Sequence, residues 1–348
     1  MLFDAIVLTS YAKFHGSRSV SAVYHLLTGK RSIQTVQDAH IYQLNDFYGI
    51  YPTLQKQAFD EHIHRLSELN LLTFTNQNAG LPTSKGKHRM EQQDTYGPIQ
   101  YFKGLLYHRK ASVFWERLLL LIQTMTNSKV NHFHFIPIID KPVVADWVKT
   151  QYLKWKNHRT CFLNQLYDEL FRLLQLFPER EASIVVDSLT SYNHYGMNSF
   201  QLANHYSLKQ IDIPLIRMAI MHQMLTVINQ NTKAYPFLAQ MVYELPQTTP
   251  LTNSASKTRE YLDRHYSAEE IAEMRQLKLN TIYDHMVEIA LYDQTFPLEH
   301  YVTPTEQAEI RAAIDKTVSF KLKNIKQEVS ETISYFQIRL VLAVEKIS

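Results

Sequence analysis

The chain has 348 residues, of which 45% are hydrophobic and 20% are charged, a composition typical of a soluble globular protein with two or three domains. Glycine is scarce, with 8 residues, and this favours a mostly α-helical fold because helices tolerate glycine poorly. The single cysteine, Cys161, excludes an internal disulfide framework and a thiolate zinc site, and it fits a reducing cytoplasm.

The N-terminal stretch 1–9 is apolar, but it contains Asp4 and has no basic start, so we do not expect a signal peptide. The longest fully apolar run, 118–122, is too short to span a bilayer, and no membrane partner is expected. The net charge of +3 is unevenly spread: residues 1–110 carry 12 Lys or Arg against 8 acidic residues, whereas residues 251–348 carry 12 against 15. The front of the chain is therefore the better candidate for phosphate contact.

Residues 1–97 predict a winged-helix-like N-terminal domain. Four helices are expected, over 2–14, from Ser19 to Gly29, from Ser32 through Tyr48, and from Thr53 onward. Residues 71–89 then read as a β-hairpin whose returning strand ends in a basic run, Lys85, Lys87 and Arg89. Such a wing would lie along the DNA backbone; the alternative is a solvated loop.

Residues 98–246 predict a helical scaffold, entered through a polar linker at 92–98. Helices are expected over 111–125, 143–155, 161–177, 199–205 and 214–228, and a short strand over 132–139. A second linker, 246–256, is rich in Thr, Pro and Ser. It leads to a third domain, 251–348.

Three short helices in 257–291 have the pattern of a helix-turn-helix. Ser267 and Glu270 form a capping box at the start of the second helix, and Ile282 and Met286 lie on the inner stripe of the third. That third helix would enter a groove through Lys278, Asn280, Thr281 and Tyr283. Lys278 would meet a phosphate and Asn280 and Thr281 would read base edges, whereas Asp284 and Glu288 would be repelled by phosphates. The module carries five basic against seven acidic residues, so docking of another protein is the competing use of this surface.

The remainder of this domain predicts a helix from Thr303 to about 318, a basic cluster of Lys321, Lys323 and Lys326, and one final helix. The apolar positions of the final helix are Val329, Ile333, Phe336, Leu340, Val344 and Ile347.

No catalytic constellation is evident, so a non-enzyme without cofactor or metal is expected. The stretch 80–87 differs from a phosphate-binding P-loop, because five residues separate its glycines and His88 replaces the magnesium-binding Ser or Thr. The pairs His62 with His64 and His132 with His134 lack a carboxylate at zincin spacing.

The C-terminal sequence resembles the helicase-associated helix-turn-helix domain, which is found on some RecQ-type DNA helicases or on a separate accessory protein in some Gram-positive bacteria. The resemblance rests on T-R-E-Y-L, S-A-E-E-I-A-E-M-R-Q-L-K-L-N-T-I-Y-D-H, P-L-E-H-Y-V and, at 333–343, I-S-Y-F-Q-I-R-L-V-L-A. Residues 19–39 resemble the N-terminal region of the stand-alone proteins. Gln276 departs from the family, which often has Gly there. The matching positions are Ser267, Ile271, Ala272, Arg275, Leu277, Thr281, Ile282 and His285.

This resemblance implies DNA binding and partnership with a RecQ-type helicase in replication or repair. The expected location is the cytoplasm, where a DNA-binding protein can associate with the nucleoid. Two other functions stay open: a sequence-specific transcription regulator, and a protein-docking scaffold without direct DNA contact.

Overall fold

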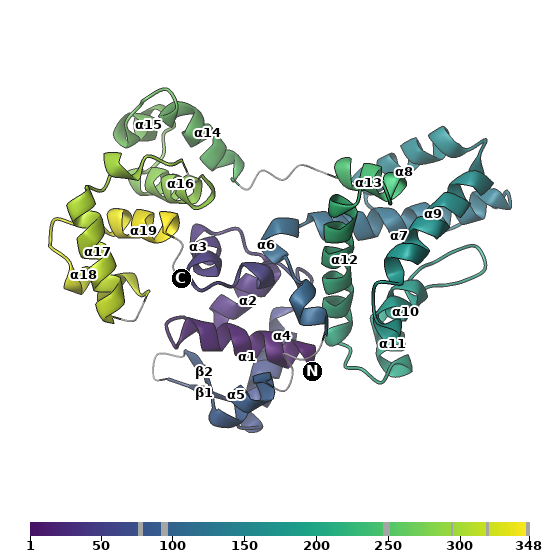
Figure 1. The fold of residues 1–348 in the computed structure, drawn as a ribbon, viewed down its shortest axis with the longest axis horizontal. Helices are drawn as coiled ribbons and strands as arrows, with labels where there is room; N and C mark the ends of the chain where they lie inside the picture. The colour runs from purple at the N-terminus through teal and green to yellow at the C-terminus, as the bar shows by residue number, and fades with distance from the viewer. Residues whose placement is uncertain (76–78, 92–96, 246–250, 294, 318–319, 346–348) are drawn as a thin grey trace. The chain divides into compact units, whose positions relative to one another are not determined.

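The computed structural model describes residues 1–75, 79–91, 97–245, 251–293, 295–317 and 320–345. The mostly α fold expected from the sequence is confirmed, because this part of the chain contains 19 α-helices and one sheet of two strands (Figure 1).

The chain forms two compact units, each assembled from separate stretches. The first unit comprises Met1–Leu8, Gly49–Gln55 and Ser84–Gln247, and the second comprises Thr9–Tyr48, Lys56–Thr83 and Thr248–Ser348. The domains 1–97, 98–246 and 251–348 expected from chain order differ from these units. The physical reason lies inside the second unit, where α3 (Ile33–Ile41) packs on α16 (Leu279–Tyr292) and α19 (Tyr335–Val344).

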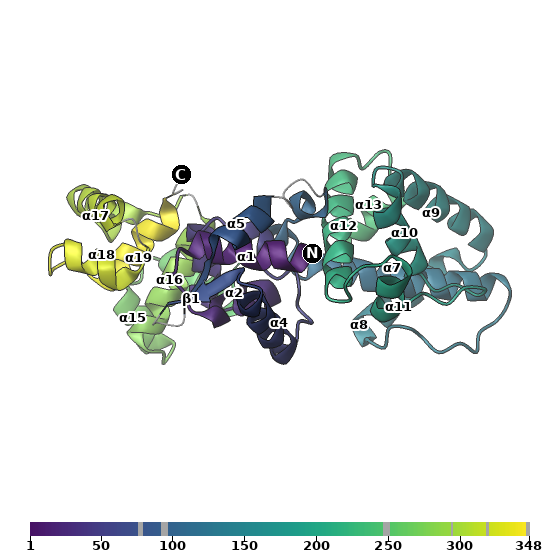
Figure 2. The same ribbon diagram turned by 90° about the horizontal axis from the view of Figure 1, so that it is seen from below.

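The first unit is built on two long apolar helices, α7 (Lys110–Lys129) and α12 (Asp212–Gln230), which pack on each other and on shorter helices (Figures 1 and 2). Phe114, Leu121 and Leu225 are fully buried in this core. The expected helices of this region are confirmed, whereas α10 and α13 were not expected. The other helices are α5 (Ser84–Glu91), η2 (Gly97–Tyr101), α6 (Gly104–Tyr107), α8 (Pro142–Trp155), α9 (Arg159–Leu174), α10 (Glu179–Asp187), α11 (Ser199–His205) and α13 (Pro236–Tyr243).

Helix α1 (Leu2–Phe14) begins in the first unit and continues into the second. Its first turn is held by the buried carboxylate of Asp212, which accepts the Phe3 N–H at 2.8 Å. A carboxylate is well suited to this place, because the first N–H groups of a helix have no partner within it.

The strand expected over 132–139 is not formed; these residues run as an extended connection between α7 and α8. Both hydrogen-bonding groups that a neighbouring strand would use are taken by the buried side chain of Gln123. Its amide donates to the Ile136 carbonyl and accepts from the Ile138 N–H, each at 3.0 Å. Between these two residues Pro137 offers no N–H.

In the second unit, α2 (Val20–Thr28) ends at Gly29 in the left-handed conformation, with φ +69°, as expected. The Ser32 hydroxyl accepts the Thr35 N–H at the start of α3. Helix α3 ends at Ile41, so the prediction that it continues through Tyr48 is wrong. The chain turns at Gln43, which has φ +51°, and a short helix η1 (Asn45–Phe47) follows. The next helix, α4, spans Lys56–Glu68.

The expected hairpin is confirmed as β1 (Leu72–Phe74) paired antiparallel with β2 (Gly80–Pro82). Gly80 is required there, because a Cβ atom would lie 2.8 Å from the buried ring of Tyr11. The basic run is not on the returning strand. Pairing stops after Pro82, and Lys85, Lys87 and Arg89 lie on helix α5 instead. Residues 76–78 of the expected turn lie outside the described residues.

The C-terminal part of this unit contains α14 (Asn253–Leu262), α15 (Ala268–Met274), α16, η3 (Leu298–His300), α17 (Pro304–Thr317), α18 (Leu322–Glu328) and α19. Helix α14 starts before the expected motif range 257–291, because the Thr252 side chain caps it by accepting the Ala255 N–H. Helix α17 starts where expected, and the Thr303 and Glu306 side chains cap it reciprocally.

The single final helix expected from 329 onward is wrong. The helix is interrupted between α18 and α19, where the Glu309 carboxylate accepts hydrogen bonds from the N–H and the hydroxyl of Ser330. The Lys326 ammonium donates to the carbonyls of Ser330, Glu331 and Ile333, so backbone groups that a continuous helix would pair internally are satisfied from outside. Ser334 then opens α19 with a capping box. Ile347 lies outside the described residues.

Candidate nucleic-acid interface

Helices α14, α15 and α16 form the three-helix motif expected from the sequence. The capping box at the start of α15 is present: the Glu270 carboxylate accepts the Ser267 N–H at 2.7 Å, and the Ser267 hydroxyl accepts the Glu270 N–H at 3.2 Å. The Ser267 N–H, and then the Ser267 hydroxyl at 2.9 Å, donate to the Glu270 carboxylate and lower its pKa. Ile271 is fully buried and Ala272 nearly so, and α15 packs on α16.

The turn between α15 and α16 is tight although it contains no glycine. Gln276 adopts the left-handed conformation with φ +52°. The Leu277 N–H donates to the Ala272 carbonyl at 2.9 Å and closes the last turn of α15. Lys278 then occupies the N-cap position of α16. Glutamine therefore takes the backbone conformation for which glycine is favoured in such turns.

A partly buried network of polar side chains links the three helices of the motif. The Arg275 guanidinium donates to the Ser254 carbonyl at 2.8 Å and also to the Thr258 hydroxyl. The Thr258 hydroxyl lies 2.9 Å from Nδ1 of His285 on α16. Burial, and then the charge of Arg275, lower the pKa of His285. Because Thr258 is on α14, Arg275 is at the end of α15 and His285 is on α16, these hydrogen bonds constrain the direction of α16 relative to the other two helices.

The first turn of α16 faces outward. Lys278 and Asn280 are exposed and Thr281 is half-buried, while Ile282 is fully buried on the opposite side. This is the surface that the sequence assigns to DNA, with an ammonium group beside an amide and a hydroxyl. Such side chains contact phosphates and base edges in the major groove.

Tyr283 is more constrained than its neighbours on this surface. Its ring stacks on Phe336 of α19, with centroids 4.0 Å apart and planes 16° apart, and its hydroxyl donates to Glu269 at 3.4 Å. Burial, and then the charge of Glu269, raise the pKa of Tyr283. Its role in packing α16 against α19 was not evident from the sequence, because Phe336 is 53 residues away in the chain.

Two acidic residues of α16 differ from the sequence expectation. Glu288 is buried, not at the edge of the outer face. Its carboxylate accepts hydrogen bonds from the Thr252 N–H at 2.5 Å and from the Thr252 hydroxyl at 3.1 Å, at the start of α14. It therefore cannot repel a phosphate at the surface. Asp284 pairs with Arg339 at 2.7 Å, and this neutralises its charge.

Three of the remaining acidic residues of the motif lie on α15, and Glu260 and Asp263 at the end of α14 are also exposed. Glu269, Glu270 and Glu273 are all exposed. A phosphate approaching Lys278 therefore encounters the field of α15 as well, and this opposes binding at low ionic strength.

The basic residues outside the motif fall on short helices. Lys85, Lys87 and Arg89 are exposed on α5; Lys85 and Arg89, four residues apart, share one side of that helix, and Lys87 points elsewhere. Lys323 is exposed on α18 and Lys321 is half-buried at its N-cap. Lys326 is occupied by the carbonyls of the α18–α19 break, so the expected cluster does not act as three equivalent cations.

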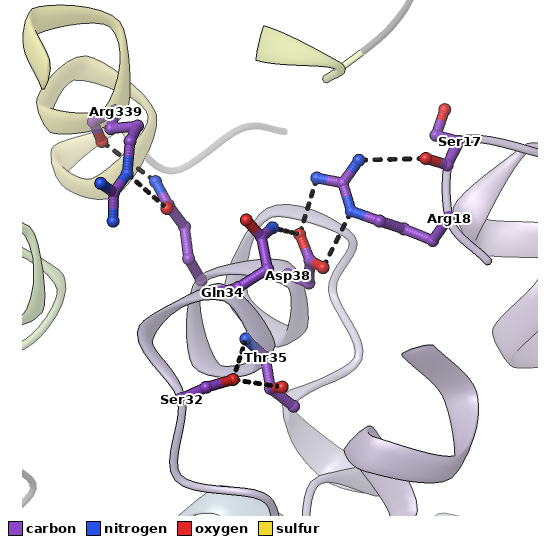
Figure 3. Close-up of polar contacts among 8 residues, drawn as sticks. Ser17, Arg18, Ser32, Gln34, Thr35, Asp38 and Arg339 are labelled. Carbon is purple, nitrogen blue, oxygen red and sulfur yellow. Dashed lines mark hydrogen bonds and ion pairs between the residues drawn. The ribbon is translucent and has the colours of Figure 1, made fainter. Parts of the chain in front are cut away.

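The N-terminal helix α3 supports the motif from behind, a role that sequence reasoning missed. The Gln37 amide donates to the Arg339 carbonyl at 3.2 Å, and the Arg339 guanidinium donates back to the Gln37 amide oxygen at 3.4 Å. On the same helix, Asp38 accepts two hydrogen bonds from Arg18 and one from Gln34 (Figure 3). These partners are up to 302 residues apart and leave no local signal.

Across the described ranges, no three His, Cys, Asp or Glu side chains come together as a metal site. None of the described helices is long and apolar enough to cross a membrane.

Comparison with known proteins finds a family model that matches this part of the chain. Residues 254–342 match the family of helix-turn-helix domains, which confirms the C-terminal domain type expected from the sequence. The whole chain is similar to protein YpbB of Bacillus subtilis (strain 168), with 29% identity over 345 residues, covering 98% of this chain and 96% of that protein. No solved structure matches the chain.

Proposed function

We propose that this protein is a non-enzymatic DNA-binding accessory of a RecQ-type helicase, located in the cytoplasm at the nucleoid. The observation that carries the proposal is the outward first turn of α16, within a segment that belongs to the helix-turn-helix domains. The helicase partnership is supported by the resemblance of the C-terminal sequence to helicase-associated domains.

In this proposal Lys278 contacts a phosphate, and Asn280 and Thr281 contact base edges. Tyr283 lies at the border of the same surface, and its stacking on Phe336 fixes the orientation of its ring. Lys85, Lys87, Arg89, Lys321 and Lys323 add phosphate contacts, which fix position without reading sequence. The absence of a catalytic constellation in the sequence supports the non-enzymatic role.

The test of DNA binding is fluorescence anisotropy on a labelled duplex at several salt concentrations. The double variant Lys278→Ala with Asn280→Ala should bind more weakly, and its log–log salt slope should be smaller by about 0.9 for one lost phosphate contact. Glu273→Gln should bind more tightly, because it removes an exposed carboxylate of α15. Lys233→Ala, an exposed lysine of the first unit, is the matched control. Equal slopes for all four proteins would refute α16 as the contact.

The helicase partnership is tested by affinity purification of the full chain from cells that express a RecQ-type helicase. Recovery of the helicase after nuclease treatment is the expected result, since partnership requires a protein contact. Recovery only while DNA is intact would refute a direct complex.

A protein-docking role for the motif is favoured by one observation, the exposed carboxylates of α15 beside the half-exposed Met274. Under that function Glu269→Lys with Glu273→Lys would abolish helicase recovery while Lys278→Ala with Asn280→Ala left duplex binding unchanged.

A further inference from the structure

The first unit carries an exposed aromatic surface that the helix-turn-helix proposal does not use. It is formed by Phe133, in the connection after α7, and by Tyr192 and Tyr195, in the loop between α10 and α11. Their exposed fractions are 53%, 44% and 86%. We call these three residues the aromatic strip. The two segments lie side by side, because the rings of His132 and Tyr192 are 5.6 Å apart.

The connection that carries Phe133 is fixed although its side chains are exposed. Asn131, with φ +59°, turns the chain out of α7, and the His132 N–H donates to the Asn127 carbonyl at 3.0 Å. The His132 ring lies 2.9 Å from the Asn127 amide oxygen, and Gln123 holds the backbone further along at residues 136 and 138. Polar side chains thus anchor the backbone and leave Phe133 uncovered.

The loop that carries the two tyrosines is equally constrained. The Tyr192 N–H donates to the Thr126 hydroxyl of α7 at 3.2 Å, and the Gly196 N–H donates to the Thr190 hydroxyl at 3.0 Å. A Cβ atom on Gly196 would lie 2.3 Å from the Ser188 carbonyl oxygen, so only glycine fits this turn. Exposed rings on a fixed backbone lose little conformational freedom when a ligand stacks on them.

The two segments that carry the aromatic strip contain no acidic residue of their own. Residues 117–139 and 188–211 contain no Asp or Glu, although the chain has 33 acidic residues. The exposed side chains of the same two segments include Lys129, His132, His134 and His194. The nearest carboxylates along the chain, those of Glu116, Asp140, Asp187 and Asp212, lie directly outside the two segments, whereas α15 carries three exposed carboxylates within its own length.

We propose that the aromatic strip binds single-stranded DNA. Proteins bind single strands by stacking bases on aromatic side chains next to cationic groups. Here the exposed rings lie on two adjoining segments, and Lys129 is four residues before Phe133. The inference rests on the proposed function as a DNA-binding helicase accessory, but it concerns a different site. A helicase converts duplex to single strands, so its accessory protein meets both forms; α16 takes the duplex and the aromatic strip takes the separated strand.

The test uses the full chain and a fluorescein-labelled oligothymidylate, which forms no duplex. Phe133→Ala with Tyr195→Ala should weaken binding at least about 10-fold, because each stacked base contributes a large share of the affinity. Phe133→Trp should retain binding and Phe133→Leu should not, since leucine keeps the apolar surface but cannot stack. Tyr243→Ala is the matched control, an 81% exposed tyrosine followed by Glu244. Far-ultraviolet circular dichroism verifies that each variant is folded.

The outcomes separate this proposal from the function it rests on. Loss of oligothymidylate binding with unchanged duplex binding supports the aromatic strip, and Lys278→Ala with Asn280→Ala should give the reverse pattern. Unchanged oligothymidylate binding in Phe133→Ala with Tyr195→Ala, or leucine as effective as tryptophan, overturns it. Tighter binding of oligouridylate would overturn the assignment to DNA. Loss of helicase recovery alone would make the strip, with the 89% exposed Ile136, a protein-docking surface.

Discussion

Single buried polar groups determine much of this fold, and His222 is the clearest case. Its ring is 1% exposed in the core of the first unit, in edge contact with the ring of Phe102. Nδ1 accepts the Lys103 N–H at 3.0 Å, so this nitrogen carries no proton. Burial lowers the pKa of His222 from 6.5 to about 3. The folded protein therefore holds this histidine neutral at pH values where an unfolded chain would protonate it.

This pKa shift predicts a loss of stability in acid. Between pH 6.5 and 3 the unfolded chain binds a proton that the folded chain does not, so the free energy of unfolding decreases as the pH falls. The slope is about 1.4 kcal/mol per pH unit, or about 2 kcal/mol between pH 7 and pH 5. His222→Gln keeps an acceptor for Lys103 but cannot titrate, and we expect it to remove this part of the pH dependence.

The measurement is urea unfolding followed by tryptophan fluorescence, which reports on the first unit because all three tryptophans, Trp115, Trp147 and Trp155, belong to it. His158→Gln, at an exposed position of the same unit, controls for the loss of a histidine. The interpretation fails if His222→Gln and the wild type lose stability equally between pH 7 and pH 5.

At the scale of elements, the turn before α16 predicts a stabilising substitution. Gln276 has φ +52°, and the left-handed conformation costs an L-residue about 1–2 kcal/mol. Glycine avoids this cost but loses about 0.5–1 kcal/mol through its freedom in the unfolded chain. Gln276→Gly should therefore raise the free energy of unfolding of the second unit by about 0.5–1 kcal/mol.

The second unit contains no tryptophan, so tryptophan fluorescence does not report its unfolding. The unfolding of its helices in urea is therefore followed by circular dichroism. Glu61→Gly, at an exposed position within α4, should change stability in the opposite direction by about 1 kcal/mol, since its backbone is helical. A destabilised Gln276→Gly would show that the turn does not store this strain.

The elements that could be predicted are those with local signals. The capping box at Ser267 and Glu270, the left-handed Gly29 and the period of α16 each depend on residues within a few positions of one another. The errors arise where a distant side chain decides. Gln123 prevents a strand at 136–138, and Glu309 and Lys326 break the expected final helix. The outward residues Lys278 and Asn280 followed from the period, whereas the burial of Glu288 depended on Thr252.

At the scale of the whole molecule, the composition of the second unit could not be read from chain order. Stretches from both ends of the chain belong to it, and α3 packs on α16 and α19 inside it. Residues 19–39 and the C-terminal domain resemble one family, but this resemblance does not indicate that the two regions contact each other. The reciprocal hydrogen bonds between Gln37 and Arg339 show that contact.

This composition predicts how the protein behaves when the chain is cut. A specific protease site in place of residues 246–250 separates the sequence of the helix-turn-helix domain from everything before it. If that domain were independent, cleavage would release it. Because its helices α16 and α19 share a core with α3, we expect the two fragments to elute together in native gel filtration and to separate only in denaturant.

Gln37→Ala with Arg339→Ala tests the cause. It removes both hydrogen bonds between the Gln37 side chain and Arg339, and also the ion pair of Arg339 with Asp284. The contact between α3 and α19 is weakened, so the cut protein should dissociate at a lower urea concentration than the cut wild type. Gln240→Ala with Arg180→Ala, which changes the same residue types within the first unit, should leave the dissociation unchanged. Release of the C-terminal fragment from the cut wild type in native buffer would mean that α3 does not hold the motif, and the direction of α16 would then depend on the network formed by Arg275, Thr258 and His285 alone.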